Sequence, residues 1–394
     1  MAHVAEPVKS KSHRSAVSDH CAWQGGSGAL SSLLRLAEQC GTQVQGAALA
    51  THDPDECLSA VLQSPGTIDV SRWTELLTPF EVDFRPLEFD GSASETRERA
   101  HTVTVFDGPN SASVVGGLES AIIARGATIR NARLLRVHDR AVYELDVRNL
   151  PRDELRHVVL AERARHPGVD LGFVANALRR GRRLVVFDVD STFLRGEMID
   201  DLAYANGRAA ECSALTAKAM RGDVDFADAL RERAALLAGL PLVDARRVAE
   251  QVVPAGGAEY LLGRLRSMGF RTAVVSGGFT FVTNRLRMQF RLDHAAANEL
   301  EVERGVLTGR TCGEIVDRAA KARWVCRFAE AEGIPLEHVV AVGDGANDLD
   351  MLEAVGLGVA YCAKPAVHAV ADATISEERL DLLLGHLSLG VPTI

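Results

Sequence analysis

The sequence predicts an α/β protein with a Rossmann-like core and a helical cap, preceded by two small α+β modules. Three observations support this prediction. First, short apolar runs separated by helical patterns, typical of a parallel sheet covered on both faces, occur at 184–187, 272–275, 339–342 and 357–361. Second, the long segment between the first two runs is rich in helix formers. Third, an earlier part of the chain alternates in the order βαββαβ.

The second module spans residues 100–176. Strand patterns and helical patterns follow one another there at 101–106, 111–124, 129–137, 142–147, 153–165 and 169–174. The first module, 1–95, is interpreted as a degenerate version of the same unit. It offers a strand pattern at 43–49 and helical patterns at 30–36 and 73–80, but no convincing opening strand. The polar tract 90–99 is expected to be a linker.

The third domain spans residues 182–394, with its core at 182–196 and 255–394. The insertion at about 197–254 contains helix formers, notably at 211–220 and 226–240, and no strand pattern. Because it follows the first strand of the sheet, we expect it to cover the carboxyl edge as a cap.

Composition narrows the function classes. The chain is 47% hydrophobic and 25% charged, as in a folded globular protein, and its net charge of −9 argues against nucleic acid or an anionic membrane as main partner. Seven cysteines without a C-x-x-C pair favour free thiols in a reducing compartment. With no apolar leader and no apolar run of membrane-spanning length, the sequence predicts a cytoplasmic protein.

Polar residues follow the predicted core strands where each ends. Asp188 and Asp190 follow the first, the tract 276–278 (Ser-Gly-Gly) the second, and Asp344 and Asp348 the third. Ligands of open α/β sheets bind at this edge. In an extended segment residues two apart point the same way, so Asp188 and Asp190 are expected to face one site. The alternative is that these residues only form turns.

Four carboxylates at one edge repel one another unless a cation binds. A hard divalent ion with oxygen ligands, Mg²⁺, suits such a set together with phosphate oxygens. An aspartate can attack phosphorus, and a second carboxylate can protonate the leaving group and then activate water.

The motifs D-x-D-S-T, S-G-G, a lysine and G-D-G-x-N-D resemble the haloacid dehalogenase superfamily of phosphatases. The resemblance implies that Asp188 is the nucleophile and Asp190 the acid/base. The implied Mg²⁺ ligands are Asp188, the backbone carbonyl of Asp190, Asp344 and Asp348, the last through water or as an outer ligand. The implied phosphate ligands are Ser276, the Gly277 amide and Lys321. Without its place between the motifs, Lys321 would be interpreted as a solvated helix residue.

Residues 182–384 resemble the phosphoserine phosphatase family more closely, in the tracts 188–197, 219–222, 226–233, 275–279, 305–309, 342–348 and 362–365. The resemblance implies that Glu197 meets the substrate ammonium and Arg233 the carboxylate, with Asn347 also at the substrate. Met220 and Phe226 would form an apolar wall. Otherwise Glu197 is a carboxylate at a helix N-terminus and Arg233 a surface arginine.

The βαββαβ order resembles the ACT domain, a module that pairs with copies of itself and often binds an amino acid. The resemblance implies a homodimer and a serine effector at the modules, near the turn 107–110. A dimerisation platform without an effector is the alternative.

The resemblance to the phosphoserine phosphatase family implies that the chain hydrolyses phosphoserine to serine and phosphate, the last step of serine biosynthesis. One rival is a related phosphatase or phosphotransferase for another small phosphomonoester, which would not need Glu197 and Arg233. The other is an amino-acid sensor with an inactive phosphatase domain, which predicts a missing catalytic carboxylate, whereas all are present.

Overall fold

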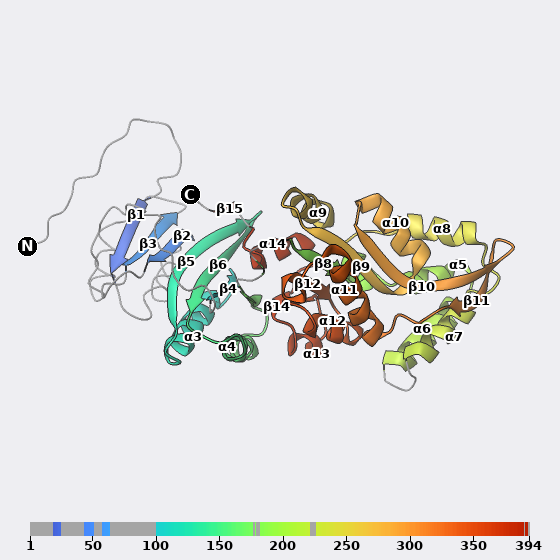
Figure 1. Cartoon of the computed structure of the whole chain (residues 1–394), viewed down its shortest axis with the longest axis horizontal. Coiled ribbons are helices and arrows are strands. Elements are labelled where there is room, and N and C mark those ends of the chain that lie inside the picture. The colour runs from blue at the N-terminus through green and yellow to red at the C-terminus, as the bar shows by residue number, and fades with distance from the viewer. Residues whose placement is uncertain are drawn as a thin grey trace, which may run out of the picture.

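The computed structural model describes residues 19–24, 43–50, 57–63, 100–175, 178, 182–220, 226–389 and 391–392 (Figure 1). Within this part of the chain the strands form two sheets, one of three strands and one of twelve. Among the same residues, no helix combines the length and the apolar character that crossing a membrane requires.

The three-stranded sheet belongs to the first module. Its strands are β1 (Asp19–Gln24), β2 (Gln43–Ala50) and β3 (Cys57–Gln63), and β3 pairs antiparallel with both neighbours. The strand expected near 43–49 is β2. The expectation that the module lacks an opening strand is wrong, since β1 occupies that place, and β3 was not predicted either. The helices expected at 30–36 and 73–80 and the linker at 90–99 lie outside the described residues.

The second module has the predicted order βαββαβ, and its strands lie in the order β7-β4-β6-β5. Its elements are β4 (Ala100–Phe106), α3 (Ser111–Ile123), β5 (Thr128–Val137), β6 (Arg140–Arg148), α4 (Arg152–Arg165) and β7 (Leu171–Ala175). Alternate residues of the strands, such as Val103, Val105 and Leu145, pack with Leu118 of α3 and Val159 of α4 in one apolar core. The alternation in the sequence therefore reflects one face covered by helices.

The core sheet continues in the order β11-β10-β9-β8-β12-β13-β14. Its strands are β8 (Leu184–Phe187), β9 (Arg271–Phe279), β10 (His294–Glu303), β11 (Val306–Cys312), β12 (Val339–Gly343), β13 (Leu357–Tyr361) and β14 (Ala373–Ile375). All pair in parallel except β11, which forms an antiparallel hairpin with β10. The four predicted strands are β8, β9, β12 and β13. The strands β10, β11 and β14 were not predicted.

Helices cover both faces of this sheet, as the continuous apolar runs predicted. The helices are α9 (Ala258–Ser267), α10 (Thr280–Phe290), α11 (Arg318–Glu332), α12 (Leu349–Glu353), α13 (Pro365–His368) and α14 (Leu383–His386). On one face Val185 of β8 packs in a cluster with residues of α9, α10 and α14. On the other face Val186 packs with residues of α11, α12 and α13.

The cap is helical, as predicted. It consists of α5 (Met198–Ala205), α6 (Ala209–Met220), α7 (Phe226–Ala235) and α8 (Leu242–Glu250), at the end of the molecule opposite the first sheet (Figure 1). The helix expected to reach residue 240 ends at Ala235, and a turn follows in which Gly239 has a left-handed backbone (φ 88°). Backbone hydrogen bonds join Gly239 and Leu240 of this turn to Leu307 of β11.

The second module and the core share one sheet. β7 pairs antiparallel with β14, where Gly172 lies opposite Ala373. A Cβ atom on Gly172 would lie 2.5 Å from that of Ala373, so a side chain there would separate the strands. Arg163 of α4 crosses the junction and donates to the carbonyl oxygens of His368 and Ala371 at 2.9 and 2.8 Å. The module is thus bonded to the core by backbone and side chains alike.

Candidate active site

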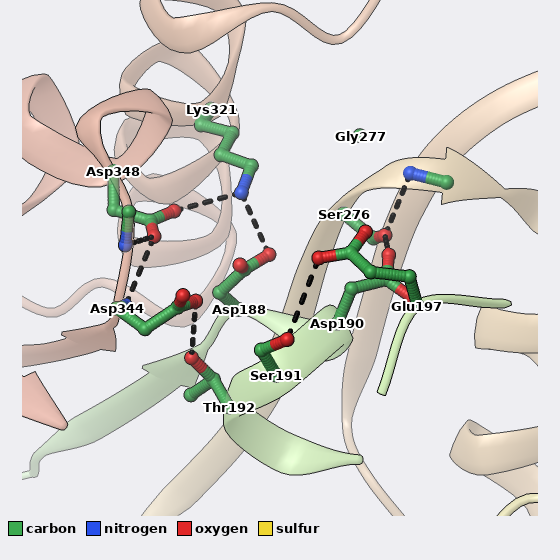
Figure 2. A network of polar contacts seen from close by, with 12 residues as sticks. Asp188, Asp190, Ser191, Thr192, Glu197, Ser276, Gly277, Lys321, Asp344 and Asp348 are labelled. Atoms are coloured by element: carbon green, nitrogen blue, oxygen red, sulfur yellow. Dashed lines mark hydrogen bonds and ion pairs between the residues drawn. The ribbon is translucent and has the colours of Figure 1, made fainter. Parts of the chain in front are cut away.

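The carboxyl ends of β8, β9 and β12 bring together many of the residues singled out from the sequence, namely Asp188, Asp190, Glu197, Ser276, Gly277, Lys321, Asp344 and Asp348 (Figure 2). The segment after β8 is not extended as expected. Residues 189–193 form a tight turn in which Ser191 has a left-handed backbone (φ 57°). Asp188 and Asp190 nevertheless point into one site (Figure 2).

Asp188 and Lys321 are in direct contact although 133 residues separate them. Lys321 projects from α11, and its Nζ lies 2.6 Å from Asp188 Oδ1 and 2.7 Å from Asp348 Oδ1. The lysine is fully buried. Burial alone would lower the pKa of Lys321, but the two carboxylates raise it above its ordinary value, so the ammonium stays charged. The expectation of a merely solvated lysine is therefore excluded.

Asp348 also organises the loop after β12. Its Oδ2 accepts hydrogen bonds from the backbone N–H groups of Asp344 and Gly345, at 3.2 and 3.0 Å. The hydroxyl of Thr192 donates to Asp344 Oδ1 at 3.1 Å. Asn347 belongs to the same turn and is partly exposed.

The carboxylates of Asp188, Asp344 and Asp348 have the chemistry of a metal site. Each contributes an oxygen, and these oxygens lie within 4.8 Å of one another. Burial raises the pKa of Asp344 to about 6, with a further contribution from Asp348. Burial also raises the pKa of Asp188 well above its usual value, and Asp348 and Asp344 raise it further against the effect of Lys321. One lysine in contact does not neutralise three carboxylates, so a divalent cation fits the cluster.

Asp190 has a different environment from Asp188. Its Oδ1 accepts from the backbone N–H of Met198 at 3.0 Å, and its Oδ2 accepts from the hydroxyl of Ser276 at 3.3 Å. Burial raises the pKa of Asp190, whereas these two hydrogen bonds and the charge of Lys321 lower it. A raised pKa favours the protonated form of Asp190, the form that a general acid needs before it donates its proton.

The loop 276–278 lies at the end of β9, opposite Asp190. The backbone N–H of Gly278 donates to Ser276 Oγ at 2.8 Å, while the carbonyl oxygen of Gly277 accepts from Asn298 Nδ2 at 2.8 Å. A Cβ atom on Gly278 would lie 3.2 Å from Asp190 Oδ2. The loop therefore approaches Asp190 closely because a glycine occupies this position.

Glu197 and Arg233 lie on the cap side. Glu197 begins α5 and accepts from the hydroxyl of Ser191 at 3.4 Å. Burial raises its pKa to about 7, and Asp190 and Asp344 add to this effect, whereas Arg233 opposes it. Arg233 of α7 also lowers the pKa of Asp190, so its charge reaches the same site. The neighbouring Arg231 points elsewhere and pairs with Asp228 at 2.8 Å.

Two expected wall residues cannot be placed. Met220 ends α6 and Phe226 begins α7, and their side chains lie outside the described residues. Three polar residues were not given roles from the sequence: Ser191, Thr192 and Asn298. The first two belong to the D-x-D-S-T motif, which signals them in principle, whereas Asn298 lies in no motif.

Comparison with known proteins identifies the family of the chain. Residues 185–353 match the haloacid dehalogenase-like hydrolases. The chain is 45% identical over 283 residues to a phosphoserine phosphatase of Streptomyces coelicolor, covering 72% of this chain and 69% of that protein. It is 43% identical over 288 residues to phosphoserine phosphatase SerB2 of Mycobacterium tuberculosis, covering 72% and 70%. The chain belongs to the phosphoserine phosphatase family of haloacid dehalogenase-like hydrolases.

A solved structure extends the likeness beyond the catalytic domain. A haloacid dehalogenase family hydrolase of Salmonella enterica matches with a TM-score of 0.62 and 27% identity, over 73% of this chain and 98% of that one. Membership of the family confirms the predicted α/β fold and the predicted enzyme class, a metal-dependent phosphoric monoester hydrolase.

Proposed function

We propose that this chain is a Mg²⁺-dependent phosphatase that hydrolyses O-phospho-L-serine to L-serine and phosphate, the last step of serine biosynthesis. The observation that supports it best is the buried contact of Lys321 with Asp188 and Asp348, beside Asp344. This arrangement presents a carboxylate nucleophile next to a positive charge and a cation site. The relatives in Streptomyces coelicolor and Mycobacterium tuberculosis are both named phosphoserine phosphatases.

In the first half-reaction a carboxylate oxygen of Asp188 attacks phosphorus, and the bond between phosphorus and the serine oxygen breaks. Asp190 donates its proton to the departing alkoxide, which leaves as serine, and an aspartyl-phosphate remains on Asp188. In the second half-reaction Asp190 takes a proton from water. The water oxygen bonds to phosphorus, the bond to Asp188 breaks, and phosphate leaves. The raised pKa of Asp190 favours the protonated form that the first of these proton transfers needs.

Mg²⁺ would be held by Asp188, the backbone carbonyl of Asp190, Asp344 and, through water, Asp348, and would neutralise charge on the transferring phosphate. Lys321 supplies a second positive charge at the nucleophile. The donors toward phosphate are the Ser276 hydroxyl, the Gly277 N–H and Lys321, with Asn347 on the substrate side. Donors fixed in advance act on charge as it develops, usually a large catalytic effect.

The amino-acid end of the substrate would be held from the cap side. The planar guanidinium group of Arg233 would donate two parallel hydrogen bonds to the substrate carboxylate. Glu197 would receive the ammonium. Since burial raises the pKa of Glu197 to about 7, a cation beside it would favour the ionised form. Met220 and Phe226 would close an apolar wall over the substrate.

We extend the proposal to the rest of the chain. Residues 1–95 and 100–176 would be ACT-like modules before the phosphatase domain at 182–394, and they would mediate a homodimer in the cytoplasm. A serine effector would bind near the turn 107–110. Asp107 there accepts from the Ser111 hydroxyl at 3.0 Å, so the carboxylate is held at the start of α3.

Phosphate release tests the proposal. The enzyme is assayed with L-phosphoserine and a panel of other phosphomonoesters, each with Mg²⁺ and with EDTA. We expect a strong preference for phosphoserine that EDTA abolishes and added Mg²⁺ restores. Equal rates across the panel would overturn the substrate assignment and leave the aspartyl-phosphate chemistry. Full activity in EDTA after exhaustive chelation would overturn the metal requirement.

A further inference from the structure

The loop 276–278, which we propose to bind phosphate, interrupts the pairing of β9 with β10. β9 and β10 pair in parallel as far as Val275 with Ala296, and pairing resumes at Phe279 with Asn298. Three residues of β9, 276–278, therefore lie opposite one residue of β10. A bulge of this kind releases backbone groups from the ladder of strand hydrogen bonds. Those groups need other partners wherever they are not exposed to water.

Asn298 supplies one of these partners. Its Nδ2 donates to the carbonyl oxygen of Gly277 at 2.8 Å, and its Oδ1 accepts from the backbone N–H of Val316 at 2.8 Å. The side chain is 1% exposed. A carbonyl oxygen only accepts and a backbone N–H only donates, so the orientation of the amide is fixed by its two partners. No other side chain of this size has one donor end and one acceptor end.

The bond to Gly277 fixes a peptide plane. The carbonyl oxygen of Gly277 and the N–H of Gly278 belong to the same planar unit and point in opposite directions. Asn298 holds the first, and Ser276 Oγ accepts from the second at 2.8 Å. Two successive glycines would otherwise leave this peptide free to rotate. The hydroxyl of Ser276 in turn donates to Asp190 Oδ2, so the clamp extends to the proposed acid/base.

The bond to Val316 connects the loop to a second element of the site. Val316 directly precedes Asp317, which caps the N-terminus of α11 by accepting from the N–H of Ala320 at 2.7 Å. That helix carries Lys321 on its first turn. One buried amide thus joins the loop proposed to bind phosphate to the start of the helix that bears the proposed phosphate lysine.

We infer that Asn298 is a positioning residue, which holds the 276–278 loop and the start of α11 at a fixed separation so that their donors converge on phosphate. The inference rests on the proposed function of this site as a phosphate site. It concerns the phosphoryl end of the substrate alone, so it applies to any phosphomonoester that the enzyme accepts.

Asn298→Asp tests the donor end selectively. At a pH where the new side chain is ionised, the carboxylate keeps an oxygen for the Val316 N–H but turns an acceptor toward the carbonyl oxygen of Gly277, so the loop loses its clamp. Removal of one transition-state donor costs about 100- to 1,000-fold, and displacement of the donors should cost about 10- to 100-fold in kcat/KM. The loss should be equal for phosphoserine and p-nitrophenyl phosphate. The inhibition constant of inorganic phosphate should rise by about 10-fold.

Asn206→Asp is the matched control. The Asn206 amide likewise donates to backbone carbonyls, those of Leu236 and Ala238 at 2.8 and 3.1 Å, but it lies in the cap. This variant should lose thermal stability and keep its inhibition by phosphate. If Asn298→Asp fails to fold, Asn298→Ser, which keeps a donor hydroxyl, should show a smaller loss of the same kind.

The outcomes separate the two proposals. If a folded Asn298 variant keeps kcat/KM and phosphate inhibition within about twofold of the parent enzyme, the residue is merely structural and the inference is overturned. If the parent enzyme prefers another phosphomonoester, the substrate proposal fails, whereas equal losses on that ester and on p-nitrophenyl phosphate still support the role of Asn298. If Asn298→Asp weakens phosphoserine alone, Asn298 acts on the amino-acid end and the inference is wrong.

Discussion

The imidazole of His386 lies where the second module meets the core, and its protonation should weaken this junction. Its Nδ1 is 2.7 Å from Thr104 Oγ1 on β4, and its Nε2 is 2.9 Å from the carbonyl oxygen of Thr374 on β14. Because a carbonyl oxygen only accepts, Nε2 carries the proton and Nδ1 accepts from the threonine hydroxyl. The ring is fully buried and packs edge-on against Phe106. The folded junction therefore holds a neutral imidazole.

The pKa of His386 is lowered from 6.5 to about 4, mainly by burial; the hydrogen bond to the Thr374 carbonyl opposes this effect and the charge of Arg163 adds to it. Between these two values the unfolded chain binds a proton at this ring and the folded chain does not. The free energy of unfolding must therefore fall as the pH drops through this window. The two pKa values correspond to a loss of about 1 kcal/mol at pH 5.5 and about 2 to 3 kcal/mol at pH 4.5.

Urea unfolding of the parent enzyme and of His386→Gln, followed by circular dichroism at pH 7.5, 5.5 and 4.5, measures this contribution. Glutamine keeps a donor and an acceptor but does not titrate. All other groups titrate in both proteins, so the difference in free energy of unfolding isolates the histidine. We expect the advantage of the parent enzyme over the variant to shrink by the amounts above. A difference that stays constant from pH 7.5 to 4.5 would show that the imidazole is not held neutral.

Three further predictions concern the active site. Asp188→Asn should abolish turnover and leave the circular dichroism spectrum unchanged, and residual turnover above about 1% in a clean preparation would exclude Asp188 as nucleophile. Arg233→Ala should raise KM for phosphoserine at least about 10-fold more than KM for p-nitrophenyl phosphate. The control variant Arg231→Ala should change neither KM. Equal effects of Arg233→Ala on both substrates would contradict a carboxylate-binding role. Thr192→Val removes the hydrogen bond to Asp344. It should raise the Mg²⁺ concentration for half-maximal activity about 10-fold, with kcat at saturating Mg²⁺ retained. An unchanged Mg²⁺ dependence would mean that Thr192 does not orient Asp344 toward the metal.

The strands that the sequence predicts are those whose burial depends least on their neighbours. β8, β12 and β13 are buried along their whole length, so an unbroken apolar run marks each one. β10 contains three consecutive alanines followed by alternating charged residues, and half of it extends into the hairpin with β11. β14 has three residues. Such strands exist because a neighbour is available for pairing, and pattern alone does not reveal that.

The first module shows the same limit. β1 has the sequence DHCAWQ, in which Cys21 and Trp23 alone supply the apolar alternation. Two apolar residues do not distinguish a strand from an irregular segment. Its pairing with β3, residue by residue from Asp19 with Leu62 to Gln24 with Cys57, defines it as a strand.

The residues of the active site differ in how easily the sequence reveals them. Asp188, Lys321 and Asp344 are in environments that are unusual for their residue types, since burying a lysine or clustering carboxylates costs free energy of folding. They therefore occur in motifs at the ends of strands, and sequence reasoning finds them. Asn298 forms hydrogen bonds that are common for its residue type, one to a backbone carbonyl oxygen and one to a backbone N–H. Its importance comes from which two backbone groups these are. That depends on the register of β9 against β10, where three residues lie opposite one. A residue that only positions backbone groups belongs to no sequence motif that would reveal it. We therefore expect further positioning residues of this enzyme at bulges and helix starts around the site rather than in its motifs.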